Sequence, residues 1–356
     1  MNTWGSKIKV SIFGESHGGG IGAVIDGIPS GLAIDTEFIK SEMQRRAPGQ
    51  NNLSTPRKEA DEVEILSGMF DGKTTGTPIC GIIRNTNTRS KDYNKDLLRP
   101  GHADFTGFMR YGESHDFRGG GHFSGRITAG LVFAGAIAKQ VLKEQGIRIG
   151  SHIKAIHNIA EKSFLDIDNL SAELLERLTE KAFPVMDEQI GNAMQEKILA
   201  ASADKNSVGG IIECAVIGAK PGWGAPFFAS TESLISSIMF SIPAVKGIEF
   251  GRGFEMSAMF GSEANDPFRT DGEKIFTTTN NNGGINGGIT NGMPIVFSVA
   301  IKPTPSIARQ QDTVDIEKME NTTIEISGRH DPCIVQRAAV VVECAAALAI
   351  LDSELI

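Results

Sequence analysis

Lys7-Ile-Lys-Val-Ser-Ile-Phe13, Gly14-Glu-Ser-His-Gly-Gly-Gly20 and Ile21-Gly-Ala-Val-Ile25 follow one another near the start of the chain. The first stretch alternates polar and apolar residues and the third is apolar, which predicts two strands. The middle stretch predicts a glycine-rich loop that carries Ser16 and His17. Because glycine lets the backbone approach a ligand closely, this loop is a candidate ligand site.

The rest of the chain mixes helix and strand patterns without regular alternation. Asp35 predicts the N-cap of a helix over residues 36–46. We expect further helices over residues 126–145, 171–183, 186–204, 231–240 and 336–351, and strands over residues 81–83, 147–159, 208–217, 246–250 and 295–301. This order favours an α+β fold over a doubly wound parallel sheet. No Pro/Ser-rich linker divides the chain, so we predict one domain over residues 1–356.

Residues 47–125 carry little periodicity and are rich in Gly, Asn, Thr, Arg and Asp. We expect this region to be irregular apart from the strand at residues 81–83. A long irregular region in a compact protein is usually functional rather than a linker.

Composition excludes several classes of protein. The chain has 356 residues, including 41 glycines, and a net charge of −8, which argues against non-specific binding to nucleic acid. The longest nearly apolar stretch, Ala338 to Leu351, contains Glu343 and falls short of the ~20 residues of a membrane span. The N-terminus has no apolar signal region, so we predict a cytoplasmic protein. The four cysteines have no metal-ligand spacing, and we predict no metal site.

Arginines in glycine-rich loops predict an anion site. The guanidinium group offers a planar fork to carboxylate and phosphate, and glycine-rich backbone can form amide nests around anions. The candidate arginines lie in or beside such loops, against the acidic balance of the chain: Arg45, Arg46, Arg57, Arg99, Arg118, Arg126 and Arg329.

Histidines supply the second signal, because imidazole acts as an acid or base near neutral pH. His17 precedes three glycines and His102 lies in Arg99-Pro-Gly-His-Ala-Asp104, so we weigh both as functional. No HExxH, GxGxxG after a strand, GxxxxGK[ST] or GxSxG pattern is found. The residues alone thus predict an enzyme with a site for a polyanion and leave its reaction open.

At these same segments the chain resembles the chorismate synthase family. The matching motifs run in order from the first predicted strand to the last helix: Phe13-Gly-Glu-Ser-His-Gly18, Ile25-Asp-Gly-Ile-Pro29, Arg45-Arg-Ala-Pro-Gly-Gln50, residues 55–68, Gly72-Lys-Thr-Thr-Gly-Thr-Pro78, Arg89-Ser-Lys-Asp-Tyr93, Arg99-Pro-Gly-His-Ala-Asp104, Ala244-Val-Lys-Gly247, Lys302-Pro-Thr-Pro-Ser306 and Gly328-Arg-His-Asp-Pro-Cys333. Together these motifs are highly specific.

The resemblance implies a lyase of the shikimate pathway of aromatic amino acid biosynthesis. Such enzymes convert 5-enolpyruvylshikimate 3-phosphate to chorismate and phosphate by 1,4-anti elimination and require reduced FMN. The resemblance also implies helices packed between antiparallel sheets in a β-α-β sandwich, and a homotetramer. Some members reduce their flavin with NADPH. No reductase domain is visible here, so an external flavin reductase is expected as a partner.

The resemblance also assigns roles residue by residue. His17 would be an acid near the leaving phosphate, His102 would hold the protonation state of the reduced flavin, and Asp331 would assist proton removal. Substrate anions would be bound by Ser16, Arg46, Arg99, Arg126 and Arg329. FMN would be lined by His122, Phe123, Ser124, Ala244, Gly287, Lys302, Pro303, Thr304, Pro305, Ser306 and Arg329.

Several positions depart from the family pattern. His122 and Phe123 stand where the family has Arg and Ser, and Ile127 replaces a Glu. The remaining departures are Pro243 for an Asn, Ala47 for the third Arg of RRRPG, and Asn52 for an Arg. Two alternatives therefore stay open beside an active enzyme: a flavin- or metabolite-binding paralogue without turnover, and a lyase that uses no flavin.

Overall fold

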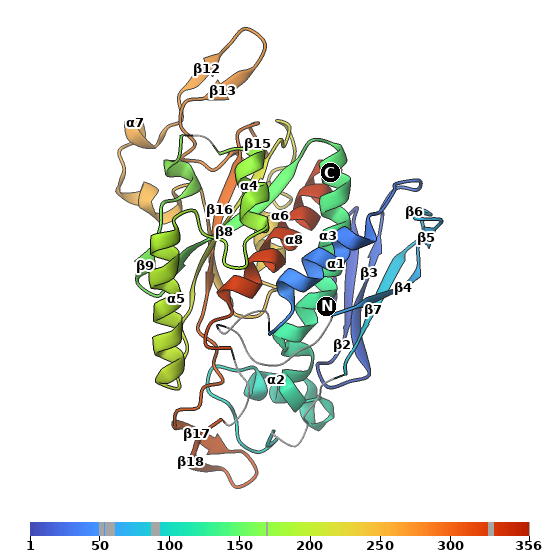
Figure 1. Cartoon of the computed structure of the whole chain (residues 1–356), viewed down its shortest axis with the longest axis vertical. Helices are drawn as coiled ribbons and strands as arrows, with labels where there is room; N and C mark the ends of the chain where they lie inside the picture. The colour runs from blue at the N-terminus through green and yellow to red at the C-terminus, as the bar shows by residue number, and fades with distance from the viewer. Residues whose placement is uncertain (50–52, 54–60, 87–92, 169, 327–330, 356) are drawn as a thin grey trace.

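Two antiparallel sheets face each other across a layer of helices (Figure 1). The computed structural model describes residues 1–49, 53, 61–86, 93–168, 170–326 and 331–355. The first sheet has the order β1 (Thr3–Trp4), β2 (Lys9–Gly14), β3 (Gly20–Asp26), β7 (Ile79–Arg84) and β4 (Val63–Ser67). The second has the order β11 (Val245–Phe250), β16 (Ile295–Ile301), β10 (Gly210–Ile217), β8 (Arg148–Ile156) and β9 (Ile159–Ala160). The predicted α+β sandwich is confirmed.

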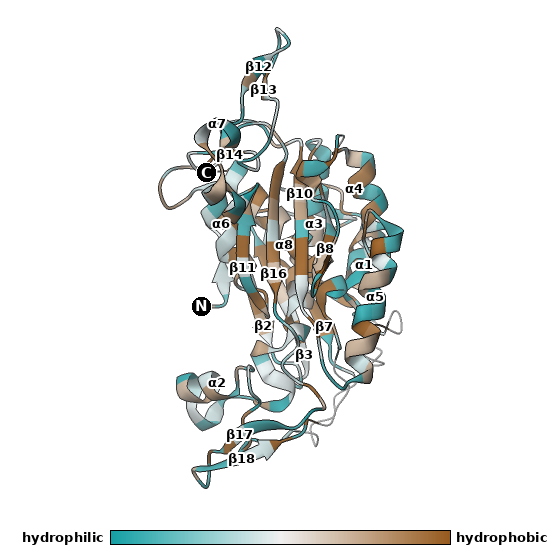
Figure 2. Cartoon of the chain, turned by 90° about the vertical axis from the view of Figure 1, so that its left-hand side faces the viewer, coloured by the Kyte–Doolittle hydropathy of each residue, from teal (hydrophilic) through white to brown (hydrophobic). Residues whose placement is uncertain are grey.

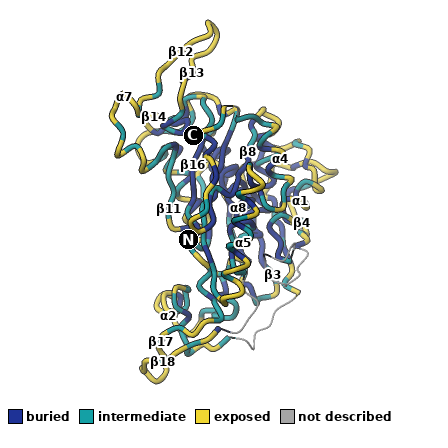
Figure 3. Tube along the Cα trace, turned by 60° about the vertical axis from the view of Figure 1, so that its left-hand side comes forward, coloured by how far each residue is buried: buried dark blue, intermediate teal, exposed yellow. Residues whose placement is uncertain are grey.

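The central layer consists mainly of α1 (Thr36–Arg46), α3 (Thr128–Glu144) and α8 (Val335–Glu354). Helix α3 packs on β3 of the first sheet, and α8 packs on β8 and β10 of the second. The two helices approach closely at Gly135, where a Cβ atom would lie 2.6 Å from the Cα of Cys344. Nearly all of α8 is buried, as the continuous apolar run predicts (Figure 3).

The outer face of the second sheet is covered by α4 (Ala172–Thr179) and α5 (Glu188–Ala203). Leu175 and Leu178 of α4 pack on Ala215 and Val296 of the sheet, while the neighbouring Phe297 belongs to the central core. Hydropathy follows this layering, with apolar strands inside and polar residues on the outer helices (Figure 2). Helix α6 (Thr231–Met239) packs beside α8.

Local predictions succeed where periodicity is strong. Asp35 caps α1 by accepting hydrogen bonds from the backbone N–H of Glu37 at 2.9 Å and of Phe38 at 3.1 Å. Strand β16 also has its predicted bounds.

The expectation that residues 47–125 are irregular is wrong in part. This region contains β4, the whole of β7, the hairpin β5 (Met69–Phe70) with β6 (Lys73–Thr74), and α2 (Asp104–Tyr111). Apart from β7, these short elements bury too few residues to leave a periodic pattern; within α2, Gly107 alone is buried.

Further short elements were also missed. They are α7 (Gly261–Ala264), β12 (Phe268–Thr270) with β13 (Ile275–Thr277), β14 (Ile285–Asn286) with β15 (Ile289–Thr290), β17 (Gln311–Asp315) with β18 (Glu320–Ile324), and 3₁₀ turns at Gly112–Ser114, Arg118–Phe123, Gly125–Ile127, Phe164–Asp166 and Gly253–Ala258. Within the described part of the chain, no helix is long and apolar enough to cross a membrane.

A buried charge cluster joins the helices of the central layer to β8. Glu343 of α8 accepts two hydrogen bonds from Arg45 of α1, at 2.7 and 2.8 Å, and one from Lys139 of α3 at 3.0 Å. Ser151 of β8 donates a fourth at 2.7 Å. Glu42 balances the charge by binding Arg45 at 2.8 Å and Lys139 at 2.6 Å. Arg45 therefore lies in the core and not in the anion site where we expected it.

Acid should weaken this cluster in a defined pH range. Burial would raise the pKa of Glu343, but the charges of Arg45 and Lys139 outweigh it and lower the pKa from 4.5 to about 2. A carboxyl with a lowered pKa stabilises the fold above its ordinary pKa, and this contribution is lost as the pH falls towards 2. We expect Glu343→Gln to lower the free energy of unfolding at neutral pH by about 3 kcal/mol.

The measurement is urea unfolding at several pH values. The unfolding free energy of Glu343→Gln should also change less between about pH 4.5 and 2 than that of the wild type. Glu37→Gln is the matched control, because Glu37 pairs with Lys40 on the exposed face of α1. Equal stability of Glu343→Gln and wild type at neutral pH would contradict the assignment.

Candidate active site

The run Gly119-Gly120-Gly121 brings the two candidate histidines together. All three glycines have positive φ, at 60°, 85° and 52°. A Cβ on Gly119 would overlap the His17 imidazole and lie 2.8 Å from Ser16 Oγ. A Cβ on Gly120 would lie 2.9 Å from Cε1 and 3.1 Å from Nε2 of His102. The imidazole of His17 thus contacts Gly119 and that of His102 contacts Gly120, and a side chain at either glycine would collide with the imidazole.

The buried Ser16 sets the orientation of His17. Ser16 Oγ lies 3.1 Å from the Arg118 carbonyl oxygen, 3.2 Å from that of Gly119, and 3.1 Å from His17 Nδ1. Its single proton goes to a backbone carbonyl, so we assign Nδ1–H of His17 as the donor to Ser16 Oγ. The backbone N–H of Ser16 also donates to Gly121 O at 3.1 Å, which ties the loop after β2 to the glycine run.

Asp104 orients His102 and Arg99. Its carboxylate accepts from His102 Nδ1 at 2.9 Å and from Arg99 Nη2 and Nε at 2.7 and 2.8 Å. Burial would raise the pKa of Asp104, but the hydrogen bonds from His102 and Arg99 outweigh it, and the pKa is lowered. The ionised carboxylate holds the His102 proton at Nδ1 and leaves Nε2 facing Gly120. Asp104 is part of the motif Arg99-Pro-Gly-His-Ala-Asp104, but the sequence analysis assigned it no role.

Asp61 brings the predicted arginines Arg46 and Arg126 together. Its two carboxylate oxygens bind Arg46 Nη1 at 3.0 Å and Arg126 Nη1. All three side chains are buried. Asp61 thus holds two guanidinium groups close together, and Arg126 is connected through Asn85 to the loop that carries His17. Sequence reasoning missed Asp61. Arg57 and Arg329 lie outside the described residues, as does Asn52.

Asn85, at the end of β7, connects these arginines to the His17 loop. Its Nδ2 donates to the carbonyl oxygens of Glu15 at 2.9 Å and Gly18 at 3.0 Å. Its Oδ1 accepts from Arg126 Nε at 3.2 Å. No sequence pattern singled out Asn85, because its partners come from distant segments.

Asp331 connects to the site through Arg337 of α8. Arg337 Nη1 donates to the Asp331 carboxylate, and Arg337 Nε donates to the backbone carbonyl of Arg46 at 2.9 Å. The predicted catalytic carboxylate therefore lies on the arginine side of the site.

The described residues that we predicted to line FMN lie in three places: Ala244 with residues 302–306, residues 122–124, and Gly287. Lys302 Nζ donates to Gly101 O, and its backbone N–H donates to Ala244 O at 2.9 Å, so the stretch 302–306 meets the segment that carries His102. Burial and the charge of Lys246 lower the pKa of Lys302. Ser124 follows the glycine run and accepts from Arg126 N–H at 3.3 Å.

His122 and Phe123 make structural contacts. His122 Nδ1 donates to Gly14 O at 2.8 Å, at the end of β2. Phe123 packs on α2, where a Cβ on Gly107 would lie 2.9 Å from its ring. The His-Phe pair thus anchors the glycine run to β2 and α2.

Gly287 lies far from the other residues of this chain that we predicted to line FMN. It belongs to the turn between β14 and β15. Gly284, just before β14, adjoins Pro294 at the start of β16, whereas Lys302 follows the end of β16. A strand of this length spans roughly 20 Å at ~3.3 Å per residue. Figure 1 shows β15 and the β17–β18 hairpin at opposite ends of the molecule.

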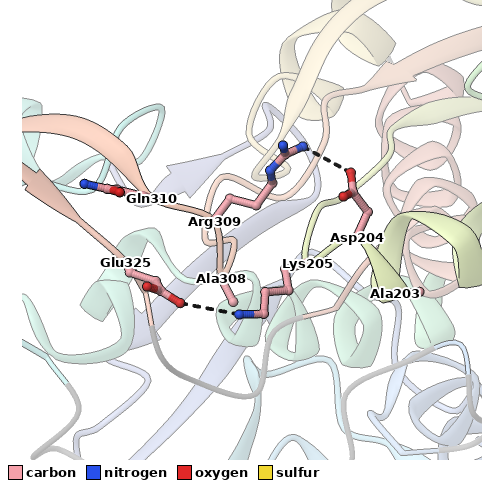
Figure 4. A pocket seen from close by; sticks show the side chains of 7 residues that line it. All are labelled: Ala203, Asp204, Lys205, Ala308, Arg309, Gln310 and Glu325. Atoms are coloured by element: carbon pink, nitrogen blue, oxygen red, sulfur yellow. Dashed lines mark hydrogen bonds and ion pairs between the residues drawn. The ribbon is translucent and has the colours of Figure 1, made fainter.

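One cavity lies apart from this cluster. It encloses about 360 Å³ and is lined by Ala203, Asp204, Lys205, Ala308, Arg309, Gln310 and Glu325 (Figure 4). Its cations pair with carboxylates, Lys205 with Glu325 at 3.7 Å and Arg309 with Asp204 at 3.1 Å, so it is poorly suited to an anion. A smaller cavity of about 160 Å³ is lined in part by Tyr93, Arg99 and Asp104 and adjoins the candidate site.

Gly119→Ala should disturb His17 specifically. Gly146→Ala is the matched control, because Gly146 also has positive φ, at 82°, but no heavy atom lies within 4 Å of its Cβ position. We expect Gly146→Ala to cost about 1–2 kcal/mol of unfolding free energy from backbone strain alone. Gly119→Ala should cost more and should also shift the His17 imidazole signals in NMR spectra, assigned with His17→Gln. Similar spectra for the two variants would contradict the predicted contact.

Comparisons with known proteins identify the family of this chain. The family model described as chorismate synthase matches residues 8–355. A chorismate synthase of Methanobrevibacter smithii is 45% identical over 353 residues, covering 99% of this chain and 95% of the relative. One of Methanocaldococcus jannaschii is 46% identical over 366 residues, covering 99% and 96%. A chorismate synthase crystal structure matches with TM-score 0.78 at 31% identity, covering 99% of this chain and 93% of that one. The chain therefore belongs to the chorismate synthase family.

Proposed function

We propose that this lyase eliminates phosphate from 5-enolpyruvylshikimate 3-phosphate to give chorismate, with reduced FMN as cofactor. The observation that carries the proposal is the joint position of His17 and His102 on Gly119 and Gly120. The buried Arg46–Asp61–Arg126 cluster is connected to this glycine run through Asn85 and the His17 loop. Acid–base groups and cations on connected loops suit the departure of a phosphate.

The cations would bind the anionic groups of the substrate. Asp61 holds the guanidinium groups of Arg46 and Arg126 close together, and this pair of cations would bind a substrate anion. Arg99 is already oriented by Asp104 and would bind a further anionic group. Ser16, which holds His17, and Arg329 complete the proposed substrate set.

The two histidines would hold protons at different places. His17, held through Nδ1 by Ser16, would supply a proton to the leaving phosphate. His102, held through Nδ1 by Asp104, would hold a proton at Nε2 beside the bound flavin. Asp331 would accept a proton, and its bond to Arg337 keeps it on the side of the substrate cations.

The residues fit a flavin phosphate and ring. Three consecutive glycines with positive φ bring backbone without side chains to this place, and Lys302 contacts Gly101, the neighbour of His102, whose ring meets Gly120. Ser124, Ala244 and residues 302–306 would hold the flavin, while His122 and Phe123 would shape the pocket by anchoring the glycine run. Reduced flavin supplies transient electron density and a proton acceptor in such an elimination.

The proposal extends to partners. Gly287 would reach a flavin only if another copy of the chain supplied it, which supports a homotetramer. We propose an external flavin reductase as the electron source in the cytoplasm, with direct reduction by NADPH as the competing possibility.

An anaerobic phosphate-release assay tests the function. Purified protein with photoreduced FMN and 5-enolpyruvylshikimate 3-phosphate should release phosphate and form chorismate, whereas oxidised FMN should give neither. Tight binding of substrate without release would favour the flavin- or metabolite-binding paralogue, and release without FMN would favour a flavin-independent lyase.

His17→Ala and His102→Ala test the proposed proton donors. Each should lower kcat roughly 10²–10⁴-fold, as expected for loss of an acid–base group. His157→Ala is the control, because this exposed histidine of the β8–β9 turn should leave kcat unchanged. Turnover at the wild-type rate in both site variants, with a folded protein, would refute the assignment.

A further inference from the structure

Tyr93 lies between two residues that are proposed to act on the substrate. Its ring meets the His17 imidazole edge to face, with centroids 5.3 Å apart and planes at 83°. The guanidinium carbon of Arg99 lies 5.3 Å from the centroid of the same ring. One side chain therefore contacts both the loop after β2 and the segment that leads into α2.

The backbone near Tyr93 is held by the β17–β18 hairpin. Leu97 forms an antiparallel bridge with Asp315 of β17, and Ile316 N–H donates to Asp96 O at 2.9 Å. Thr313 Oγ1 donates to Leu98 O. The hairpin lies outside both large sheets (Figure 1), and residues 96–98 connect it to the part of the chain that carries Tyr93 and Arg99.

The surroundings of Tyr93 are unlike those of a core aromatic residue. The ring is half-buried and borders the cavity of about 160 Å³ together with Arg99 and Asp104. Apolar side chains such as Leu98, Phe108 and Ile316 line the same cavity, so the ring faces open space with both charged and apolar neighbours. Edge-to-face contact with an imidazole and contact of a ring with a guanidinium are both attractive and depend on direction.

We propose that Tyr93 is a positioning residue that holds His17 and Arg99 in one arrangement for an anionic substrate. The inference rests on the proposed function, in which His17 gives a proton and Arg99 binds an anionic group. Both contacts use the aromatic ring, so phenylalanine should replace tyrosine while an aliphatic side chain should not.

The activity test compares Tyr93→Phe with Tyr93→Leu. Tyr93→Phe should keep kcat/KM within about twofold, whereas Tyr93→Leu should lower it roughly 10- to 100-fold through a lower kcat and a higher KM. Phe70→Leu is the matched control, because Phe70 is exposed on β5 and should tolerate the same loss of a ring. Full activity of Tyr93→Leu, or equal loss in Tyr93→Phe, would overturn the proposal.

A second measurement does not depend on turnover. The chain contains two tyrosines, Tyr93 and Tyr111, so labelling with 3-fluorotyrosine should give two ¹⁹F NMR signals, assigned with Tyr111→Phe. His17→Ala should shift the Tyr93 signal and leave that of Tyr111 in place. An unchanged Tyr93 signal would overturn the contact. If the wild type released no phosphate, the proposed function would fail while the ¹⁹F spectra would still decide whether Tyr93 contacts His17.

Discussion

The cluster around Glu343 is the constraint on which the rest of the structure depends. A buried carboxylate is tolerated only when cations and hydrogen-bond donors surround it, and here Arg45, Lys139 and Ser151 come from three different elements. Meeting that requirement fixes how α1, α3 and α8 lie against β8. Arg45 is the neighbour of Arg46, so the same packing places Arg46 next to Asp61 at the candidate site.

The candidate site depends on a second constraint, the absence of side chains on Gly119 and Gly120. His17 and His102 occupy the space that two Cβ atoms would fill, so their proximity follows from backbone shape more than from attraction. Polar side chains then fix the orientations, Ser16 for His17 and Asp104 for His102. Contacts within the chain thus position both imidazoles, which suits the electrostatic stabilisation of a leaving anion in the proposed reaction.

Prediction from sequence succeeded for elements whose own residues show a clear periodicity or a capping residue. The cap and bounds of α1, the span of β16 and the buried α8 follow from local periodicity and capping. Helix α2 and strand β4 were missed because they are short and mostly exposed. Of the site, the glycine runs, histidines and loop arginines were recognised by type, but Asp61, Asn85 and Tyr93 were not, since their partners lie far away in sequence.

The sequence by itself determined the α+β class, the chemical nature of the site and the resemblance to chorismate synthases, because residue types and motifs are local properties. Only the tertiary structure decided which charges meet. It paired Arg45 with Glu343 in the core and Arg46 with Asp61 at the site, although the two arginines are neighbours on α1. The physical reason is that successive residues of a helix point about 100° apart, so packing directs Arg45 towards Glu343 of α8 and Arg46 towards Asp61.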